Sequence, residues 1–224
     1  MTQSAALVDY QSARLNMVES QIRPNKVSDP AIIEAILAVP RERFVPAALR
    51  GIAYVDEDVP LGGGRYLMEP MVFGRLLQFA AIGRDDVVLD VGCGSGYASA
   101  VMAQLTRKVV ALEDDPALAH GAAARFAELA ISNVVPVEGA LTAGWPELAP
   151  YDVILFNGAV AAIPPAIAGQ LAKGGRLVAV VQAEPGMGKA VLMTRVEGVY
   201  AQRIVFDAGT PMLPGFAARP GFVF

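Results

Sequence analysis

Cysteine, histidine and tryptophan are almost absent, because the 224 residues contain one of each, and charged residues make up only 18%. The single cysteine, Cys93, has no partner for an internal disulfide, which favours a reducing compartment. Lys and Arg form no block and the net charge is −4, so the charge pattern of a nucleic-acid-binding protein is missing. Pro or Gly interrupts each apolar tract well before the ~18 residues that a membrane helix needs, and the first residues do not resemble a signal peptide. We predict a cytoplasmic protein that binds neither nucleic acid nor membrane.

Hydrophobic residues make up 54% of the chain, enough for a large core in one domain. In the first part of the sequence, helical periodicity predicts a helix from Ser4 to about Gln21. A second helix is expected to begin at a cap formed by Ser28 or Asp29 and to end at Pro40. Residues 41–61 contain several helix breakers and are expected to form loops and short pieces, and a third helix is expected over 70–81.

From residue 83 onward, continuously apolar strands alternate with helices, which is typical of a parallel sheet covered on both faces. The expected strands are 87–91, 108–113, 133–138, 151–157 and 176–182, and the expected helices between them are 98–106 and 116–130. Residues 191–206 alternate differently around Glu197-Gly198 and predict a closing antiparallel hairpin. We therefore predict one doubly wound α/β domain, with residues 1–82 as a helical extension and 83–224 as the core.

The segment VLDVGCGSGYASA (88–100) is the strongest functional signal, since a strand runs into three alternating glycines and then a helix. A plain strand-to-helix turn does not need three glycines, which instead let a ligand approach the backbone closely. The dinucleotide-binding fingerprint fails because Tyr97 stands at its last position, and no Lys-Ser/Thr follows as in a phosphate-binding loop. The remaining pattern, G-x-G-x-G after Asp90, resembles the first motif of S-adenosylmethionine-dependent methyltransferases.

A closer resemblance extends over nearly the whole chain. Six segments occur in the order found in protein-L-isoaspartate O-methyltransferases: MVESQIR (17–23), VPRERFVP (39–46), AYVDEDVPLGGG (53–64), VLDVGCGSGY (88–97), YDVILFNGAV (151–160) and LAKGGRLVAVV (171–181). The resemblance implies the class I methyltransferase fold, with a mostly parallel sheet, a C-terminal antiparallel hairpin and an N-terminal helical addition. It implies methylation of the α-carboxyl of L-isoaspartyl residues in damaged proteins or peptides, with S-adenosylmethionine as donor and S-adenosylhomocysteine as product.

The same resemblance implies the cofactor site. Asp90 would lie near the methionine end of the cofactor, Gly92 and Gly94 would pass beneath it, and Glu113 would hold the ribose hydroxyls. The full set of candidate cofactor-binding residues is Asp90, Gly92, Cys93, Gly94, Gly96, Tyr97, Glu113, Asp114, Gly139, Ala140 and Asn157. No metal site is predicted.

The stretch GGGRYLMEP (62–70) departs from the family pattern of the substrate cleft, approximately G-x-G-Q-T-I-S-x-P. Tyr66 stands where the family has Thr, and Met68, where it has Ser, offers no hydroxyl for the substrate carboxyl. Arg65 is able to replace that donor through two parallel bonds to a carboxylate, and Tyr66 through its phenol. Alternatively, Arg65 points into solvent and Met68 simply packs. Arg65, Tyr66 and Met68 are the candidate catalytic residues, and the glycine run is interpreted as a substrate gate.

A second departure is Ala140, where the family usually has an Asp that accepts from the adenine amino group. Losing that bond should weaken cofactor binding without abolishing it. Two alternatives to isoaspartyl methylation stay open: a family member with another methyl acceptor, and a weakly catalytic module that binds the cofactor or a partner. The single histidine, His120, falls in an alanine-rich helix and is expected to be solvated. A carboxylate acceptor is already ionised at neutral pH, so no general base is needed.

Overall fold

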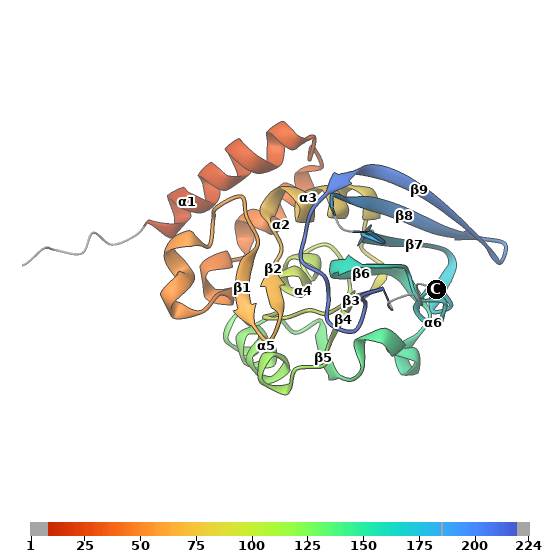
Figure 1. Ribbon diagram of the computed structural model, residues 1–224. Helices are drawn as coiled ribbons and strands as arrows, with labels where there is room; N and C mark the ends of the chain where they lie inside the picture. The colour runs from red at the N-terminus through yellow and green to blue at the C-terminus, as the bar shows by residue number, and fades with distance from the viewer. Residues whose placement is uncertain (1–8, 185, 219–224) are drawn as a thin grey trace, which may run out of the picture.

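The computed structural model describes residues 9–184 and 186–218 and has a seven-stranded sheet at its centre (Figure 1). The strand order is β5-β4-β3-β6-β7-β8-β9. The strands span β3 Val87–Val91, β4 Lys108–Glu113, β5 Val134–Glu138, β6 Tyr151–Val160, β7 Leu171–Val181, β8 Gly188–Val196 and β9 Val199–Ala208. The first five of these are parallel, and β8 and β9 run antiparallel to their neighbours.

Both faces of the central strands β3, β4 and β6 are buried, as their continuously apolar sequences predict. Successive residues of a strand point to opposite faces. In β3, Val88 therefore belongs to the larger buried cluster, together with the N-terminal helices, whereas Leu89 belongs to a second cluster on the other face. The larger cluster extends from Met17 to Ala208, so the N-terminal helices pack on the same core as the sheet.

The helices begin where the sequence supplies capping groups. The first helix, α1 (Tyr10–Met17), is capped by Asp9 and continues into a π-helical turn, Val18–Ile22. The capping residue was not predicted, and Ser4, where the helix was expected to begin, lies outside the described residues. Helix α2 (Pro30–Ala38) has the predicted cap, because the Asp29 side chain accepts from the Ala31 N–H at 2.8 Å.

Helices α3 Pro70–Ala80, α4 Tyr97–Met102 and α5 Pro116–Glu128 lie where the sequence predicted them, and each ends earlier than expected. The single turn α6 Pro165–Ala168 was not predicted. His120 is exposed on α5 and its Nδ1 lies 2.7 Å from the Pro116 carbonyl oxygen, so the prediction of a solvated helix residue is confirmed. Among the described residues, no helix has the length and apolar character needed to cross a membrane.

Two short strands, which the sequence did not predict, lie before α3. Residues 41–52 form 3₁₀ turns, as expected for this region, but β1 (Val59–Gly62) and β2 (Arg65–Leu67) then pair as a small antiparallel hairpin. Gly63 and Gly64 form its turn, and Gly62, Gly63 and Gly64 all have positive φ, between 58° and 96°. The C-terminal hairpin was predicted correctly: β8 and β9 meet at Glu197-Gly198, both with positive φ.

Candidate functional site

The loop after β3 has a backbone conformation that favours glycine. Gly92, Gly94 and Gly96 have φ values of 78°, 56° and 92°, a region that side chains with a Cβ rarely enter. At Gly96 a Cβ would lie 2.6 Å from the Phe126 ring, which packs beneath the loop. The amides of Gly92 and Cys93 both donate to the Leu112 carbonyl, at 2.9 and 3.0 Å, and so tie the loop to β4.

Asp90, on β3, is fully buried and only half satisfied. Its Oδ2 accepts from the Ser99 hydroxyl at 2.6 Å, whereas Oδ1 has no hydrogen-bond partner among the described residues. Burial raises the pKa of Asp90 to about 7, and the nearby Glu113 charge adds to this effect. A buried acceptor without a donor is unfavourable by itself and is what a ligand with a donor group would satisfy.

Glu113 ends β4 next to this loop and is fully buried. Its carboxylate accepts three backbone N–H groups: Gly94 at 2.8 Å on Oε2, and Asp114 and Asp115 at 2.9 and 3.1 Å on Oε1. The fold therefore holds a negative charge at this place with fixed backbone donors.

Arg65, at the start of β2, lies directly on Glu113. Its Nε is 3.0 Å from Oε1 and 3.2 Å from Oε2, and its Nη2 is 2.9 Å from Oε1. Nη2 also donates to Asp114, and the side chain is only 2% exposed. The sequence analysis left two positions open for Arg65, against a substrate carboxylate or in solvent. The structure shows neither, because Arg65 pairs with Glu113, the predicted ribose-binding residue.

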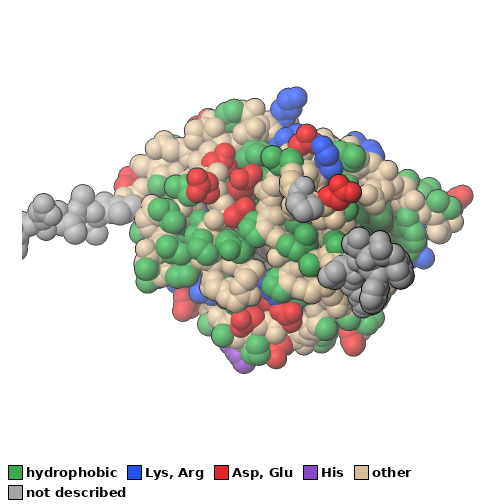
Figure 2. Space-filling model, in the orientation of Figure 1, with side chains coloured by type: hydrophobic (Ala, Val, Ile, Leu, Met, Phe, Trp, Pro, Cys, Tyr) green, Lys and Arg blue, Asp and Glu red, His purple; other side chains and the backbone are tan. Residues whose placement is uncertain are grey.

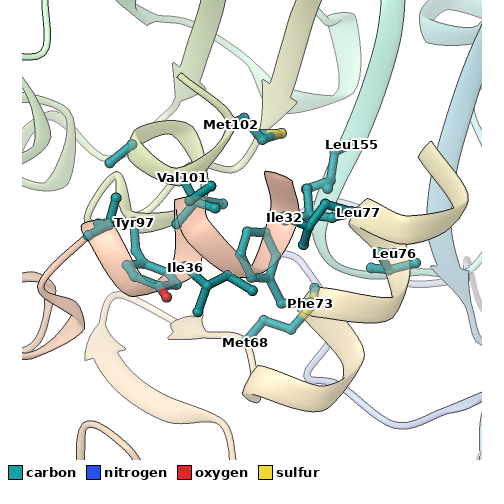
Figure 3. Close-up of a cluster of buried hydrophobic side chains, with 14 of the residues drawn as sticks. Ile32, Ile36, Met68, Phe73, Leu76, Leu77, Tyr97, Val101, Met102 and Leu155 are labelled. Atoms are coloured by element: carbon teal, nitrogen blue, oxygen red, sulfur yellow. The ribbon is translucent and has the colours of Figure 1, made fainter. Parts of the chain in front are cut away.

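Met68 belongs to the hydrophobic core. Its side chain is 3% exposed and is buried among residues that include Ile36 and Phe73 (Figure 3). The buried Arg41 donates from Nη2 to the Met68 carbonyl at 2.7 Å and holds the backbone at this point. Of the two alternatives left open for Met68, the structure favours packing, which corrects the expectation that this side chain faces a substrate. Tyr66 points the other way and is 39% exposed, because strand residues alternate.

The other candidate cofactor-binding residues divide into those at the loop and those turned away from it. Tyr97 is 2% exposed and its ring packs on Phe44 and Phe73, with the Arg41 guanidinium 4.9 Å from the ring centroid. The first turn of α4 therefore directs the Tyr97 side chain into the core. Cys93 is also buried, which raises the pKa of its thiol.

Residues after β5 and on β6 complete the edge of the site. The Gly139 amide donates to the Glu113 carbonyl at 3.0 Å, which joins these two segments, and Ala140 is exposed beside it. Asn157, on β6 directly after the last residue that pairs with β3, is 8% exposed. Trp145, which was not predicted, lies against Gly139: a Cβ there would be 2.9 Å from its ring.

A second unpredicted contributor is Leu213, in the segment after β9 that crosses in front of the sheet (blue in Figure 1). Its amide donates to the Ala159 carbonyl at 2.8 Å. Its side chain packs on two glycines, since a Cβ on Gly92 would lie 2.8 Å from its Cδ2 and one on Gly158 would lie 2.7 Å from its Cγ. The place of Leu213 in the site depends only on contacts between distant segments, so no local sequence signal identifies it.

Acidic side chains gather beside the hairpin, on the face seen in Figure 2. Burial raises the pKa of Glu69 to about 7, with further contributions from Asp58, Asp56 and Glu57. The Asp58 carboxylate accepts from the Glu69 amide at 3.0 Å and from the Thr210 hydroxyl at 3.1 Å. This face therefore carries negative charge around the start of α3.

Comparison with known proteins identifies the family. Residues 12–205 match the family model described as protein-L-isoaspartate(D-aspartate) O-methyltransferase. The chain belongs to this family. A protein-L-isoaspartate O-methyltransferase of Methylorubrum extorquens (strain PA1) is 41% identical over 194 residues, covering 87% of this chain and 84% of the relative. A second, from Rhodopseudomonas palustris (strain HaA2), is 38% identical over 206 residues, covering 91% and 84%.

Solved structures agree with this assignment. A protein-L-isoaspartate O-methyltransferase structure superposes with a TM-score of 0.79 and 25% identity, covering 91% of this chain and 67% of that one. A beta-aspartate methyltransferase structure of Plasmodium falciparum, in complex with S-adenosyl-L-homocysteine, gives a TM-score of 0.76 at 20% identity, covering 91% and 97%. The predicted fold, an α/β class I methyltransferase sheet with a C-terminal antiparallel hairpin, is confirmed.

Proposed function

We propose that this chain transfers the methyl group of S-adenosylmethionine to the α-carboxyl of L-isoaspartyl residues in proteins or peptides, as a protein-repair enzyme. Membership of the protein-L-isoaspartate O-methyltransferase family supports the reaction. The observation on which the proposal depends most is the carboxylate of Glu113, held by backbone amides beside the Gly92–Gly96 loop.

The residues at the carboxyl edge of the sheet fit this cofactor. Asp90 has a buried oxygen free for the methionine end, and Gly92 and Gly94, both at positive φ, would pass beneath it without side chains of their own. Glu113 would accept from the ribose hydroxyls, and the segment at Gly139, next to Trp145, would border the adenine. Cys93, Gly96, Asp114, Ala140 and Asn157 complete the proposed site.

Methyl transfer requires little of the protein beyond binding and orienting the two reactants. When bound, the cofactor supplies a methyl group on a sulfonium that is already activated for in-line transfer. The acceptor carboxylate has an ordinary pKa near ~4 and is ionised at neutral pH, so the chain does not have to remove a proton. The protein has to align the two reactants and exclude water.

Tyr66 is the residue that we assign to the acceptor. It is exposed on the β1–β2 hairpin, next to Arg65, and its phenol is a hydrogen-bond donor. Met68 has no such role, because its side chain is buried in the core.

A paired-peptide assay tests the proposed function. An isoaspartyl peptide and its normal aspartyl twin are incubated with the protein and S-adenosylmethionine, and methanol released from the ester is measured. We expect release from the isoaspartyl peptide alone, loss of it in Glu113→Ala, and a reduced rate in Tyr66→Phe. Equal release from both peptides, or none from either with the cofactor bound, would contradict the acceptor assignment.

One observation favours a second candidate, a family member with another acceptor. Position 68 offers no hydroxyl to an acceptor, and the nearby face carries Asp58 and Glu69, which repel an anionic substrate. The same assay distinguishes the two, since this candidate binds the cofactor and leaves both peptides unmodified. For either acceptor we infer a cytoplasmic location, supported by the single cysteine.

A further inference from the structure

The ion pair between Arg65 and Glu113 joins the two halves of the proposed site. Arg65 comes from the hairpin assigned to the acceptor side, and Glu113 is the carboxylate assigned to the ribose. Both side chains are at most 2% exposed, so the contact is buried rather than a surface pair.

Glu113 has no acceptor capacity left in this arrangement. A carboxylate offers about four acceptor positions. Oε1 receives the Arg65 Nε and Nη2 and two backbone amides, and Oε2 receives the Gly94 amide and a longer contact from Nε. The backbone donors are fixed by β4 and the glycine loop. Ribose hydroxyls therefore reach Glu113 only by displacing the guanidinium.

Arg65 itself is incompletely satisfied, which separates it from an optimised structural ion pair. Its Nη1 is buried and has no hydrogen-bond partner among the described residues. Its second partner, Asp114, has a side chain that is 40% exposed and is not among the groups assigned to the ribose hydroxyls. A displaced guanidinium thus keeps one carboxylate partner at the edge of the site.

The hairpin that carries Arg65 is built in a way that permits such a shift. Its two strands pair at three positions with one irregularity, and its turn consists of Gly63 and Gly64. It also approaches the site at Gly63 and Leu61: a Cβ on Gly63 would lie 2.8 Å from Asp115 Oδ2, and Leu61 Cδ1 lies 3.0 Å from the position of a Cβ on Gly94.

We propose that Arg65 is an internal competitor for the cofactor, occupying Glu113 until the ribose hydroxyls displace it and the β1–β2 hairpin moves. This inference rests on the proposed function and adds two consequences to it. Arg65 lowers the apparent cofactor affinity, because only the displaced state binds. It also couples cofactor binding to the acceptor side, since the displaced hairpin carries both Arg65 and Tyr66.

Calorimetric titration with S-adenosylhomocysteine tests this competition. The wild type is compared with Arg65→Gln, which removes the charge, and with Arg43→Gln, a matched control whose exposed ion pair with Glu128 lies elsewhere. We expect Arg65→Gln to bind about tenfold more tightly than the wild type, and Arg43→Gln to bind like the wild type. Unchanged or weaker binding by a folded Arg65→Gln overturns the proposal.

A second measurement uses the wild type alone and so does not depend on how the variant folds. Hydrogen exchange of the amides in 59–67 is followed with and without saturating S-adenosylhomocysteine. Release of the ion pair predicts faster exchange in the complex, and unchanged or slower exchange overturns the proposal. If neither the wild type nor Arg65→Gln binds S-adenosylhomocysteine, the cofactor assignment of the proposed function fails instead.

Discussion

The hairpin β1–β2 pairs three couples of residues around Gly63-Gly64, whereas β8–β9 pairs nine couples around Glu197-Gly198. Each hairpin also contains a residue that forms an ion pair. In β8–β9 the pair joins Lys189 and Asp207 across the strands, and both side chains are about half exposed. In β1–β2 the ion pair joins Arg65 of the hairpin to the buried Glu113 at the end of β4.

The two hairpins are therefore held in place by different interactions. A long backbone ladder keeps β8–β9 in place, and its ion pair is screened by solvent. The short β1–β2 ladder depends instead on a buried charge that belongs to the proposed cofactor site. We expect the conformation of β8–β9 to be independent of what occupies the site and the conformation of β1–β2 to change with it.

The largest expected effect comes from removing the interior charge. Glu113→Gln leaves Arg65 buried with Asp114 as its remaining carboxylate partner, and breaking a buried pair in this way typically destabilises by about 3–5 kcal/mol. Urea unfolding of Glu113→Gln and the wild type measures the difference. A loss below about 1 kcal/mol would mean that β1–β2 does not depend on this pair.

Asp90, a second buried charge at the same edge of the sheet, gives a pH-dependent effect. Its pKa is raised to about 7 in the folded state, so the protonated form is favoured there and stability is lost as pH rises from about 4 to about 7. The wild type should therefore lose roughly a few kcal/mol relative to Asp90→Asn over this range. The pKa of Glu69 is also raised, but Glu69 is present in both proteins, so its contribution to the pH dependence cancels in the comparison.

Unfolding by urea at pH 4.5, 6 and 8 measures this difference for both proteins. Parallel stability curves for the wild type and Asp90→Asn would contradict the assignment of a raised pKa to Asp90.

Alanine at one glycine in each turn gives a smaller contrast. Gly63 and Gly198 both have positive φ, so each substitution introduces backbone strain of about 1 kcal/mol. At Gly198 the new Cβ meets no atom within 4 Å, whereas at Gly63 it would lie 2.8 Å from Oδ2 of Asp115, whose other carboxylate oxygen, Oδ1, caps α5. We expect Gly63→Ala to destabilise by about 1 kcal/mol more than Gly198→Ala, because capping is disturbed. Thermal unfolding of the two variants compares them directly, and equal losses would show that β1–β2 is not packed on Asp115.

The smallest effect is expected in the β8–β9 ion pair. Lys189→Ala should change the free energy of unfolding by no more than about 0.5–1 kcal/mol, because the pair with Asp207 is exposed. Urea unfolding at low and high salt is the measurement. A loss as large as that of Glu113→Gln would remove the contrast between the two hairpins.

The sequence predicted features that depend on neighbouring residues. The cap at Asp29 followed by Pro30, the turn at Glu197-Gly198 and the glycine loop after Asp90 each have a local chemical cause. The positions of the parallel strands followed from their continuously apolar character, although β7 begins five residues earlier than expected, at Leu171.

The sequence did not predict contacts between distant segments. Arg65 meets Glu113 across 48 positions, and Leu213 packs on Gly92 and Gly158 after the whole sheet has been completed. The roles of Met68 and Tyr97 depended on which way a side chain points at the end of a strand or the start of a helix. A motif match does not show which way a side chain points, and in the structure both side chains pack in the core.

A crystal structure of the protein with S-adenosylhomocysteine is the most direct test of the central claim that Glu113 anchors the cofactor. We expect both ribose hydroxyls within hydrogen-bonding distance of the Glu113 carboxylate, the adenine beside Gly139, and the Arg65 guanidinium displaced toward Asp114. A nucleoside bound elsewhere, or bound while Arg65 still occupies both oxygens of Glu113, would contradict it.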